Sequence, residues 1–134
     1  MTVLLSEQRS VQTSEDVVAV RQAVRQRAVE LGFNLVDQTK IVTAASELAR
    51  NTVQYGGGGH VIIEGVENLG RRGLRLTFDD QGPGIADIDQ AMRDGFTTGT
   101  GLGLGLSGAR RLSNEFAIES QPGRGTRVTI TRWR

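Results

Sequence analysis

The sequence predicts an α+β fold: a two-layer α/β sandwich in which helices cover one face of a mixed, mostly antiparallel sheet. After a β-rich edge segment come two helical segments, a pair of β-rich runs, glycine-rich turns with further helical segments, and a second pair of β-rich runs. Each pair is joined by a short turn, which is typical of an antiparallel hairpin. The chain has 134 residues, the size of one domain. We therefore expect residues 1–134 to form a single domain.

The first half of the chain is expected to hold a strand and two helices. Residues 3–11 are β-rich and predict an edge strand. Ser14 is a candidate N-cap for the first helix, whose apolar residues recur at helical spacing until Gly32 ends it. Asp37 is expected to cap the second helix. That helix runs into four consecutive glycines, 56–59, which we interpret as a helix stop.

The remaining elements are expected around glycine-rich turns. Strands at 60–67 and 74–79 would form a hairpin whose turn contains Gly70 and Gly73. After the turn at Asp80 we expect, in order, a short helix at 85–93, a loop at 94–100, a helix at 104–114, and strands at 116–120 and 127–133 around the turn 121–125.

Composition excludes several classes of function. Sixteen basic and fifteen acidic residues leave a formal charge of +1, which gives no electrostatic reason to expect a nucleic acid or an anionic membrane as partner. The chain has no cysteine, so it has neither a disulfide framework nor a thiolate metal site. No apolar run approaches the roughly 20 residues of a membrane span, and residues 1–9 do not resemble a secretion signal. We expect a cytoplasmic protein.

Two glycine-rich turns predict a nucleotide pocket. The first reads Asp80-Gln-Gly-Pro-Gly84, and the second covers residues 99–108. Glycine allows the backbone to approach a ligand closely, and successive N–H groups at a helix start can hold a phosphate. The carboxylate of Asp80 can accept a hydrogen bond from an amino group such as that of adenine.

The second predicted helix carries a carboxylate and an amide one turn apart, Glu47 and Asn51, which therefore share a face. A carboxylate there is placed to act as a general base. Mg²⁺ needs few protein oxygens when phosphates supply the others, so one amide is sufficient. Taken alone, Glu47 would be read as a solvated surface carboxylate. His60 is the only histidine, which disfavours a histidine-based metal site or catalytic triad.

The glycines allow two other interpretations. Gly82 and Gly84 alone are equally consistent with an ordinary turn. Residues 103–108 match the dinucleotide-binding fingerprint literally, but no apolar strand precedes them and no acidic residue follows at the required distance. We treat that match as accidental.

Four motifs occur together in a fixed order along nearly the whole chain. They are Glu47-Leu-Ala-Arg-Asn51 on a helix, Asp80-x-Gly82-x-Gly84 after a strand, Gly101-x-Gly103-x-Gly105 before a helix, and Gly125-Thr126 entering a strand. Together they resemble the GHKL ATP-binding family of gyrase, Hsp-type chaperones, histidine kinases and MutL. Within that family the chain is most similar to the small anti-sigma-factor serine kinases. The resemblance implies the Bergerat, or GHKL, ATP-binding fold.

The resemblance also implies a role for each matched residue. Asn51 would ligate Mg²⁺ that bridges the triphosphate of ATP, and Asp80 would accept the adenine amino group. Thr126 would support Asp80 through its hydroxyl or a water. The backbone at Gly82 and Gly84 would meet the base, residues 93–105 would form a lid, and N–H groups around Gly101, Gly103 and Gly105 would face the β- and γ-phosphates.

One departure from the family pattern concerns the phosphates. Histidine kinases commonly carry a lysine three residues after the magnesium asparagine, and Gln54 occupies that place here. We expect Arg50 or Arg93 to supply part of the missing positive charge.

The predicted function is that of a protein serine/threonine kinase with ATP and Mg²⁺ as cofactors and Glu47 as the catalytic base. The resemblance implies STAS-domain proteins as substrates, a partner-switching pathway of stress or sigma-factor control, and a regulatory phosphatase as a possible second partner. Two alternatives remain: a nucleotide-gated binding module with little phosphotransfer, and a simple ATPase.

Overall fold

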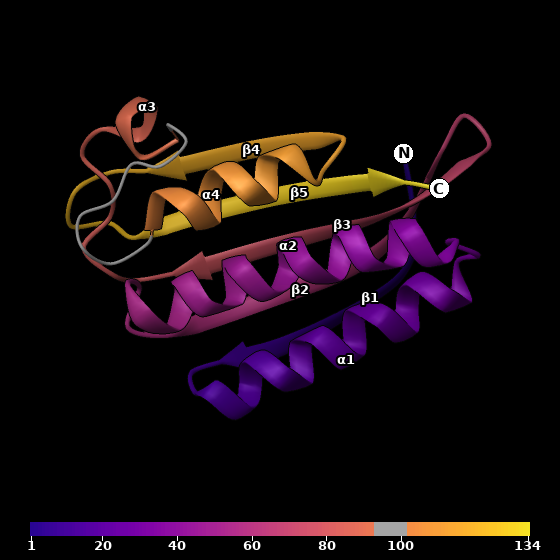
Figure 1. Cartoon of the computed structure of the whole chain (residues 1–134), viewed down its shortest axis with the longest axis horizontal. Helices are drawn as coiled ribbons and strands as arrows, with labels where there is room; N and C mark the ends of the chain where they lie inside the picture. The colour runs from indigo at the N-terminus through magenta and orange to yellow at the C-terminus, as the bar shows by residue number, and fades with distance from the viewer. Residues whose placement is uncertain (93–101) are drawn as a thin grey trace.

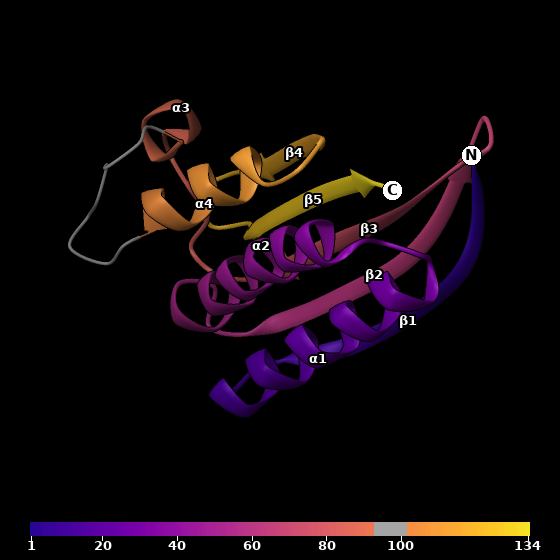
Figure 2. The same cartoon turned by 45° about the vertical axis from the view of Figure 1, so that its right-hand side comes forward.

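One layer of the molecule is a five-stranded sheet and the other consists of helices (Figures 1 and 2). The computed structural model describes residues 1–92 and 102–134. The elements are β1 (Thr2–Val11), α1 (Ser14–Glu30), α2 (Leu35–Gln54), β2 (Gly59–Asn68), β3 (Arg71–Asp80), α3 (Ile88–Ala91), α4 (Leu102–Arg111), β4 (Glu115–Ser120) and β5 (Thr126–Trp133). The strand order is β1-β2-β3-β5-β4, with β1 at an edge as expected. The α+β sandwich is confirmed, and all four strand pairs are antiparallel, so the described sheet is not mixed.

Helix α2 lies at the centre of the helical layer, between α1 and α4 (Figure 1). Its buried residues include Ile41 and Leu48, which pack toward the sheet with Ile63, Leu76 and other apolar residues of the strands. Full burial of an aliphatic side chain of this size stabilises the fold by about 1.5–3 kcal/mol. The core therefore fixes α2, which carries the predicted catalytic and metal-binding residues, firmly over the sheet.

The caps of both long helices precede the predicted ones, by one residue in α1 and by three in α2. Thr13, not Ser14, caps α1: its hydroxyl accepts from the N–H of Asp16 at 3.1 Å, and the Asp16 carboxylate accepts from the N–H of Thr13 at 3.3 Å. Asn34, not Asp37, caps α2 by accepting from the N–H of Asp37 at 2.8 Å. An N-cap residue needs an extended backbone, which Thr13 and Asn34 have.

The carboxylate of Asp37 serves a different purpose from capping. It forms a partly buried ion pair with the guanidinium of Arg132 in β5, with an N–O distance of 2.7 Å. The first turn of α2 is thereby tied to the last strand of the sheet.

The hairpin of β2 and β3 is confirmed, but its turn is tighter than expected. Only Leu69 and Gly70 separate the strands, and both have positive φ angles, 52° and 81°. Gly73 was predicted to lie in the turn and instead lies in β3, pairing with Trp133 of β5. An added Cβ at Gly73 would come within 2.6 Å of the Trp133 ring, so packing in the sheet explains this glycine.

The later helices also differ in extent from the prediction. In place of a helix at 85–93, α3 covers only Ile88–Ala91, and the N–H of Ile85, ahead of this helix, donates to the hydroxyl of Ser120 at 2.8 Å. In place of 104–114, α4 runs from Leu102 to Arg111, and Asn114 already bonds to Thr131 of β5. The predicted loop at 94–100 lies outside the described residues, and β4 and β5 form the expected hairpin.

Within the described ranges, every helix is too short or too polar to cross a membrane.

Candidate functional site

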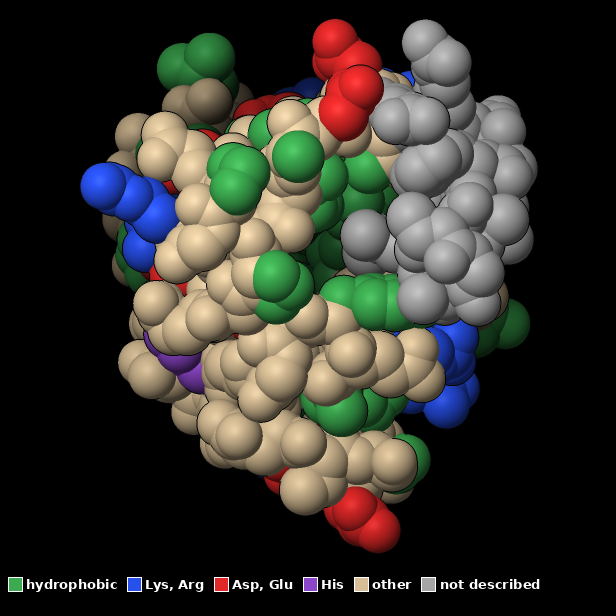
Figure 3. Space-filling model, turned by 90° about the vertical axis from the view of Figure 1, so that its left-hand side faces the viewer, with side chains coloured by type: hydrophobic (Ala, Val, Ile, Leu, Met, Phe, Trp, Pro, Cys, Tyr) green, Lys and Arg blue, Asp and Glu red, His purple; other side chains and the backbone are tan. Residues whose placement is uncertain are grey.

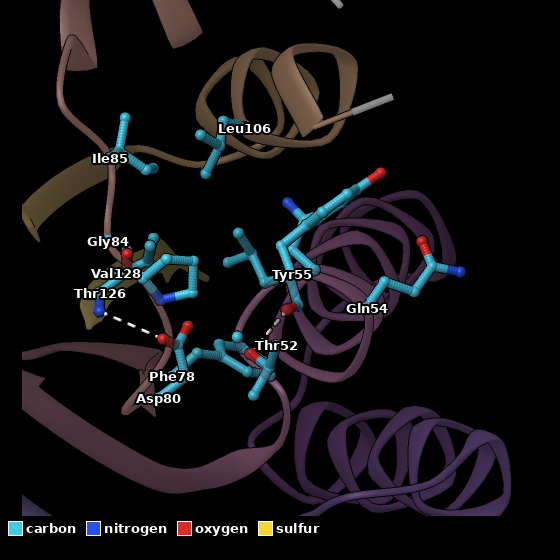
Figure 4. Close-up of a pocket in the computed structure, with 14 residues that line it drawn as sticks. Thr52, Gln54, Tyr55, Phe78, Asp80, Gly84, Ile85, Leu106, Thr126 and Val128 are labelled. Atoms are coloured by element: carbon cyan, nitrogen blue, oxygen red, sulfur yellow. Dashed lines mark hydrogen bonds between the residues drawn. The ribbon is translucent and has the colours of Figure 1, made fainter. Parts of the chain in front are cut away.

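A cavity of about 300 Å³ opens where β3 leaves the sheet. Figure 3 shows this end of the molecule, with a hollow that has hydrophobic side chains inside it, and Figure 4 shows the residues around the cavity. The lining residues are Leu48, Asn51, Thr52, Gln54 and Tyr55 of α2 and its C-cap, Gly56, Phe78 and Asp80 of β3, Pro83, Gly84, Ile85, Leu106 of α4, and Thr126 and Val128 of β5. The volume is at the lower end of the range for small-molecule sites.

The cavity has apolar walls and one charged group. Phe78 and Val128 come from the sheet, and Ile85 and Leu106 lie across from them (Figure 4). Asp80 is the only charged residue among the described lining residues. An apolar slot with a single carboxylate fits a flat heterocycle that carries a hydrogen-bond donor at its edge.

The carboxylate of Asp80 is held at one oxygen. Its Oδ1 accepts from the backbone N–H of Gly82 at 2.9 Å. It also accepts from the backbone N–H of Thr126 at 3.2 Å, the bond drawn in Figure 4. Burial raises the pKa of Asp80, the two backbone hydrogen bonds oppose that rise, and the charge of Asp79 adds to it. No residue within 1–92 or 102–134 donates to Oδ2, so this oxygen is available to a ligand donor.

Thr126 supports Asp80 in a different way from the one expected. Its backbone N–H contacts the carboxylate, whereas its hydroxyl pairs with the hydroxyl of Ser120 at 2.8 Å. Ser120 also bonds to the carbonyl of Gly125 and to the N–H of Ile85. Ser120 is not predictable from the sequence, because nothing in its local pattern distinguishes it from an ordinary strand-end serine.

The two glycines of the Asp80 turn have different surroundings. Gly84 lines the cavity, has a φ of +77°, and lies against the backbone of Gln121 and Pro122. Gly82 does not line the cavity; an added Cβ there would come within 2.6 Å of the Gly56 Cα. Of the two turn glycines, therefore, Gly84 is the one whose backbone can contact a ligand in the cavity.

Asn51 lies on the α2 side of the cavity and has an unsatisfied polar group. Its Nδ2 is buried, and no described residue forms a hydrogen bond with it. Leaving such a group without a partner costs about 1–3 kcal/mol, and a native fold retains one where function needs it or where a partner is still to bind. Among the described residues, the fold therefore provides no hydrogen-bond partner for this amide nitrogen.

The donor set around Asn51 fits magnesium better than a metal caged by protein. No group of three or more potential ligand side chains occurs in the described part of the chain. Mg²⁺ is commonly bound by one or two protein oxygens together with substrate phosphates and water. A single carboxamide oxygen in the cavity lining meets that requirement.

The start of α4 lies against Asn51. An added Cβ at Gly105 would come within 2.8 Å of the Asn51 Nδ2, so only glycine lets the two approach so closely. Gly103 and Gly105 lie in the first turn of α4, where N–H groups have no partner within the helix. Gly101 and Arg93 lie outside the described residues.

Glu47 and Arg50 lie outside the cavity lining and form an ion pair with each other. The N–O distance is 3.2 Å, and the side chains are 35% and 50% exposed. Glu47 precedes Asn51 by about one turn of the same helix. Gln54, at the position of the expected lysine, extends away from the cavity centre in Figure 4.

Comparison with known proteins matches residues 36–133 to the family described as histidine kinase-, DNA gyrase B-, and HSP90-like ATPase. The chain is 50% identical to the serine/threonine-protein kinase RsbT of Bacillus subtilis over 92% of both chains. It is 31% identical to the anti-sigma F factor of Geobacillus thermodenitrificans, over 89% of this chain and 85% of that one. It is 30% identical to the anti-sigma F factor of Thermoanaerobacter sp., over 90% and 87%.

Proposed function

Because the chain belongs to the family of histidine kinase-, DNA gyrase B- and HSP90-like ATPases, we propose that it is an ATP-dependent protein serine/threonine kinase. One observation supports this most directly: Asp80 and the unsatisfied Asn51 line the same cavity, with Glu47 one turn away on α2. The similarity to RsbT over nearly the whole chain agrees with it.

Asp80 recognises the base. Its Oδ2 accepts a hydrogen bond from the amino group of adenine, while the backbone N–H groups of Gly82 and Thr126 hold Oδ1 in place. The backbone at Gly84 approaches the ring, and Phe78 and Val128 form its apolar surroundings. Gly82 and Thr126 thus serve base recognition through the position they give the carboxylate.

The other end of the cavity binds the triphosphate. Asn51 would hold Mg²⁺ through its carboxamide oxygen, and the metal would neutralise charge on the phosphates. N–H groups around Gly101, Gly103 and Gly105 donate to the β- and γ-phosphates. Arg50 supplies part of the positive charge absent at Gln54, for which it must leave its ion pair with Glu47.

Glu47 activates the acceptor hydroxyl. The serine or threonine oxygen of the partner attacks the γ-phosphorus, the bond between that phosphorus and the β,γ-bridging oxygen breaks, and ADP leaves. The hydroxyl proton passes to the Glu47 carboxylate. Because Glu47 is about one-third exposed, a protein substrate can reach it from outside the cavity.

The substrates we propose are STAS-domain regulators in a partner-switching pathway of stress or sigma-factor control, with a regulatory phosphatase as a second partner. The similarity to both a serine/threonine-protein kinase and anti-sigma F factors supports this assignment. ATP is supplied in the cytoplasm, and we place the protein there.

The test is phosphate transfer from labelled ATP, with Mg²⁺, to purified STAS-domain proteins encoded near this chain. We expect label on one candidate with the wild type and, at the same subsaturating ATP concentration, much less with Asp80→Asn. Absence of transfer to any candidate, with ATP binding intact, would contradict kinase activity.

A nucleotide-gated binding module is the second candidate, favoured by the pairing of Glu47 with Arg50 outside the cavity. Glu47→Ala separates the two: a kinase loses transfer but keeps ATP, whereas a module keeps nucleotide-dependent partner binding and its biological effect. Release of phosphate without any protein acceptor would identify a simple ATPase instead.

A further inference from the structure

The four-glycine run after α2 does more than end the helix. Helix α2 ends at Gln54, and Tyr55 is its C-cap. Gly57 and Gly58 have φ angles of +70° and +102°, which account for glycine at those two positions. Gly56 has no positive φ, so its backbone conformation does not require glycine. Another constraint must act at this position.

That constraint is the side chain of Asp80. A Cβ added to Gly56 would lie 2.5 Å from Oδ2 and 2.6 Å from Cβ of Asp80, closer than real Cβ atoms approach other heavy atoms. The Asp80 side chain is short and has no flexible end that could move aside alone. A methyl group at residue 56 would therefore displace the carboxylate itself.

Gly56 contacts Asp80 at Oδ2, the oxygen that recognises the base in the proposed function. The inference therefore rests on that function. Oδ1 is held by Gly82 and Thr126, whereas Oδ2 lies against Gly56. Gly82 in turn lies against Gly56, since an added Cβ at Gly82 would come within 2.6 Å of the Gly56 Cα. The carboxylate is thus fixed by hydrogen bonds at one oxygen and by close backbone packing at the other.

We propose that Gly56 is a positioning residue for base selection, acting through Asp80. Adenine presents an amino group where guanine presents a carbonyl oxygen. A carboxylate aimed at that position accepts from adenine and repels guanine. Displacement of Asp80 by a side chain at residue 56 then weakens ATP binding and also reduces the preference for ATP over GTP.

The test compares Gly56→Ala with Gly73→Ala, a control outside the cavity lining where an added Cβ also comes within 2.6 Å of a side chain, that of Trp133. Calorimetry with MgATP and MgGTP should show at least a tenfold loss of ATP affinity and a several-fold loss of ATP preference for Gly56→Ala only. Gly56→Ala with the wild-type ATP preference would overturn the proposal. A wild type that binds no ATP would instead overturn the proposed function.

A second pair of variants keeps the test decisive if Gly56→Ala folds poorly. Asp80→Gly removes every Asp80 atom within 2.6 Å of the added methyl group. In that background Gly56→Ala should change nucleotide affinity less than twofold and should lower the melting temperature less than it does in the wild type. Additive losses in the double variant would show that Gly56 acts independently of Asp80 and would overturn the proposal.

Discussion

The two ends of the cavity differ in how completely the fold builds them. At the Asp80 end, two backbone hydrogen bonds and a close glycine contact fix the carboxylate before any ligand binds. At the Asn51 end, a buried amide nitrogen has no described partner, and Glu47 and Arg50 pair with each other near the surface.

This difference separates recognition from chemistry. A preformed carboxylate gives the base a fixed partner and loses little entropy on binding. The groups around Asn51 are expected to bind the phosphates, the metal and the protein substrate. The comparison predicts that variants at the two ends affect different quantities: affinity at one, transfer at the other.

The largest effect is expected from Glu47→Gln, which tests the transfer end. Loss of a general base typically lowers the rate about 10²–10⁴-fold. Single-turnover phosphotransfer should fall by that factor, while calorimetry should find ATP affinity within about twofold of the wild type. Glu30→Gln is the matched control, because Glu30 also pairs with an arginine three residues away on a helix. Equal losses of ATP affinity and of the phosphotransfer rate would contradict the separation of recognition from chemistry.

A smaller effect, on affinity, is expected from Asp80→Asn at the recognition end. An asparagine that keeps accepting from Gly82 and Thr126 presents its amide N–H groups to the adenine amino group. Hydrogen bonds to charged groups contribute about 1.5–3 kcal/mol, so ATP affinity should fall about 10–100-fold. Asp79→Asn is the control, because Asp79 is paired with Arg127 and does not line the cavity. A Kd unchanged in Asp80→Asn would remove the basis of the proposed function.

The pH dependence of Asp80 sharpens the comparison further. Burial raises its pKa above the ordinary 3.8, so the folded state holds the proton more tightly than the unfolded state does. The contribution of Asp80 to the free energy of unfolding is therefore greatest below pH 3.8 and declines as pH rises through the folded-state pKa. ATP binding should strengthen over the same window, because the ionised form accepts the adenine amino group.

Urea unfolding and ATP titration across that pH range measure the two trends. Asp80→Asn has no titrating group at this position, so the difference between the wild type and this variant isolates Asp80 from groups such as Glu7, whose lowered pKa has the opposite effect on stability. A difference in unfolding free energy that rises with pH together with ATP affinity would contradict the assigned role.

The smallest effect is expected from Arg50→Ala. Its ion pair with Glu47 is exposed, and such pairs contribute about 0–1 kcal/mol to stability. We expect about a threefold loss of ATP affinity from the missing charge and a change in unfolding free energy below about 1 kcal/mol. Unchanged ATP affinity and turnover in this variant would exclude Arg50 as a phosphate-binding cation.

Local sequence patterns predict the layers and the strand pairs of this fold well, because hairpin turns and apolar periodicity are properties of neighbouring residues. They place the caps less well: Asp37 has a good capping side chain, but its pairing with Arg132, 95 positions away, is invisible to any local pattern. The site shows the same limit. The family resemblance implies that Asn51 and Asp80 belong to one pocket, and both line the same cavity.

The supporting contacts of the site depend on distances between segments. The backbone N–H of Thr126, not its hydroxyl, bonds to Asp80, and that hydroxyl pairs with Ser120 instead. Gly56 packs against the side chain of Asp80, 24 positions away. No repeat, period or turn signal in the sequence encodes such contacts, since each depends on how the sheet and α2 are packed.

The ion pair between Asp37 and Arg132 couples the C-terminal strand to the helix that carries the candidate site. It links the next-to-last residue of β5 to the opening turn of α2, and the adjacent Arg134 reaches the carbonyl of Gly32 just before that helix. A tag, truncation or binding partner that displaces β5 therefore also displaces α2. Glu47 and Asn51 lie on this helix, 10 and 14 residues after Asp37.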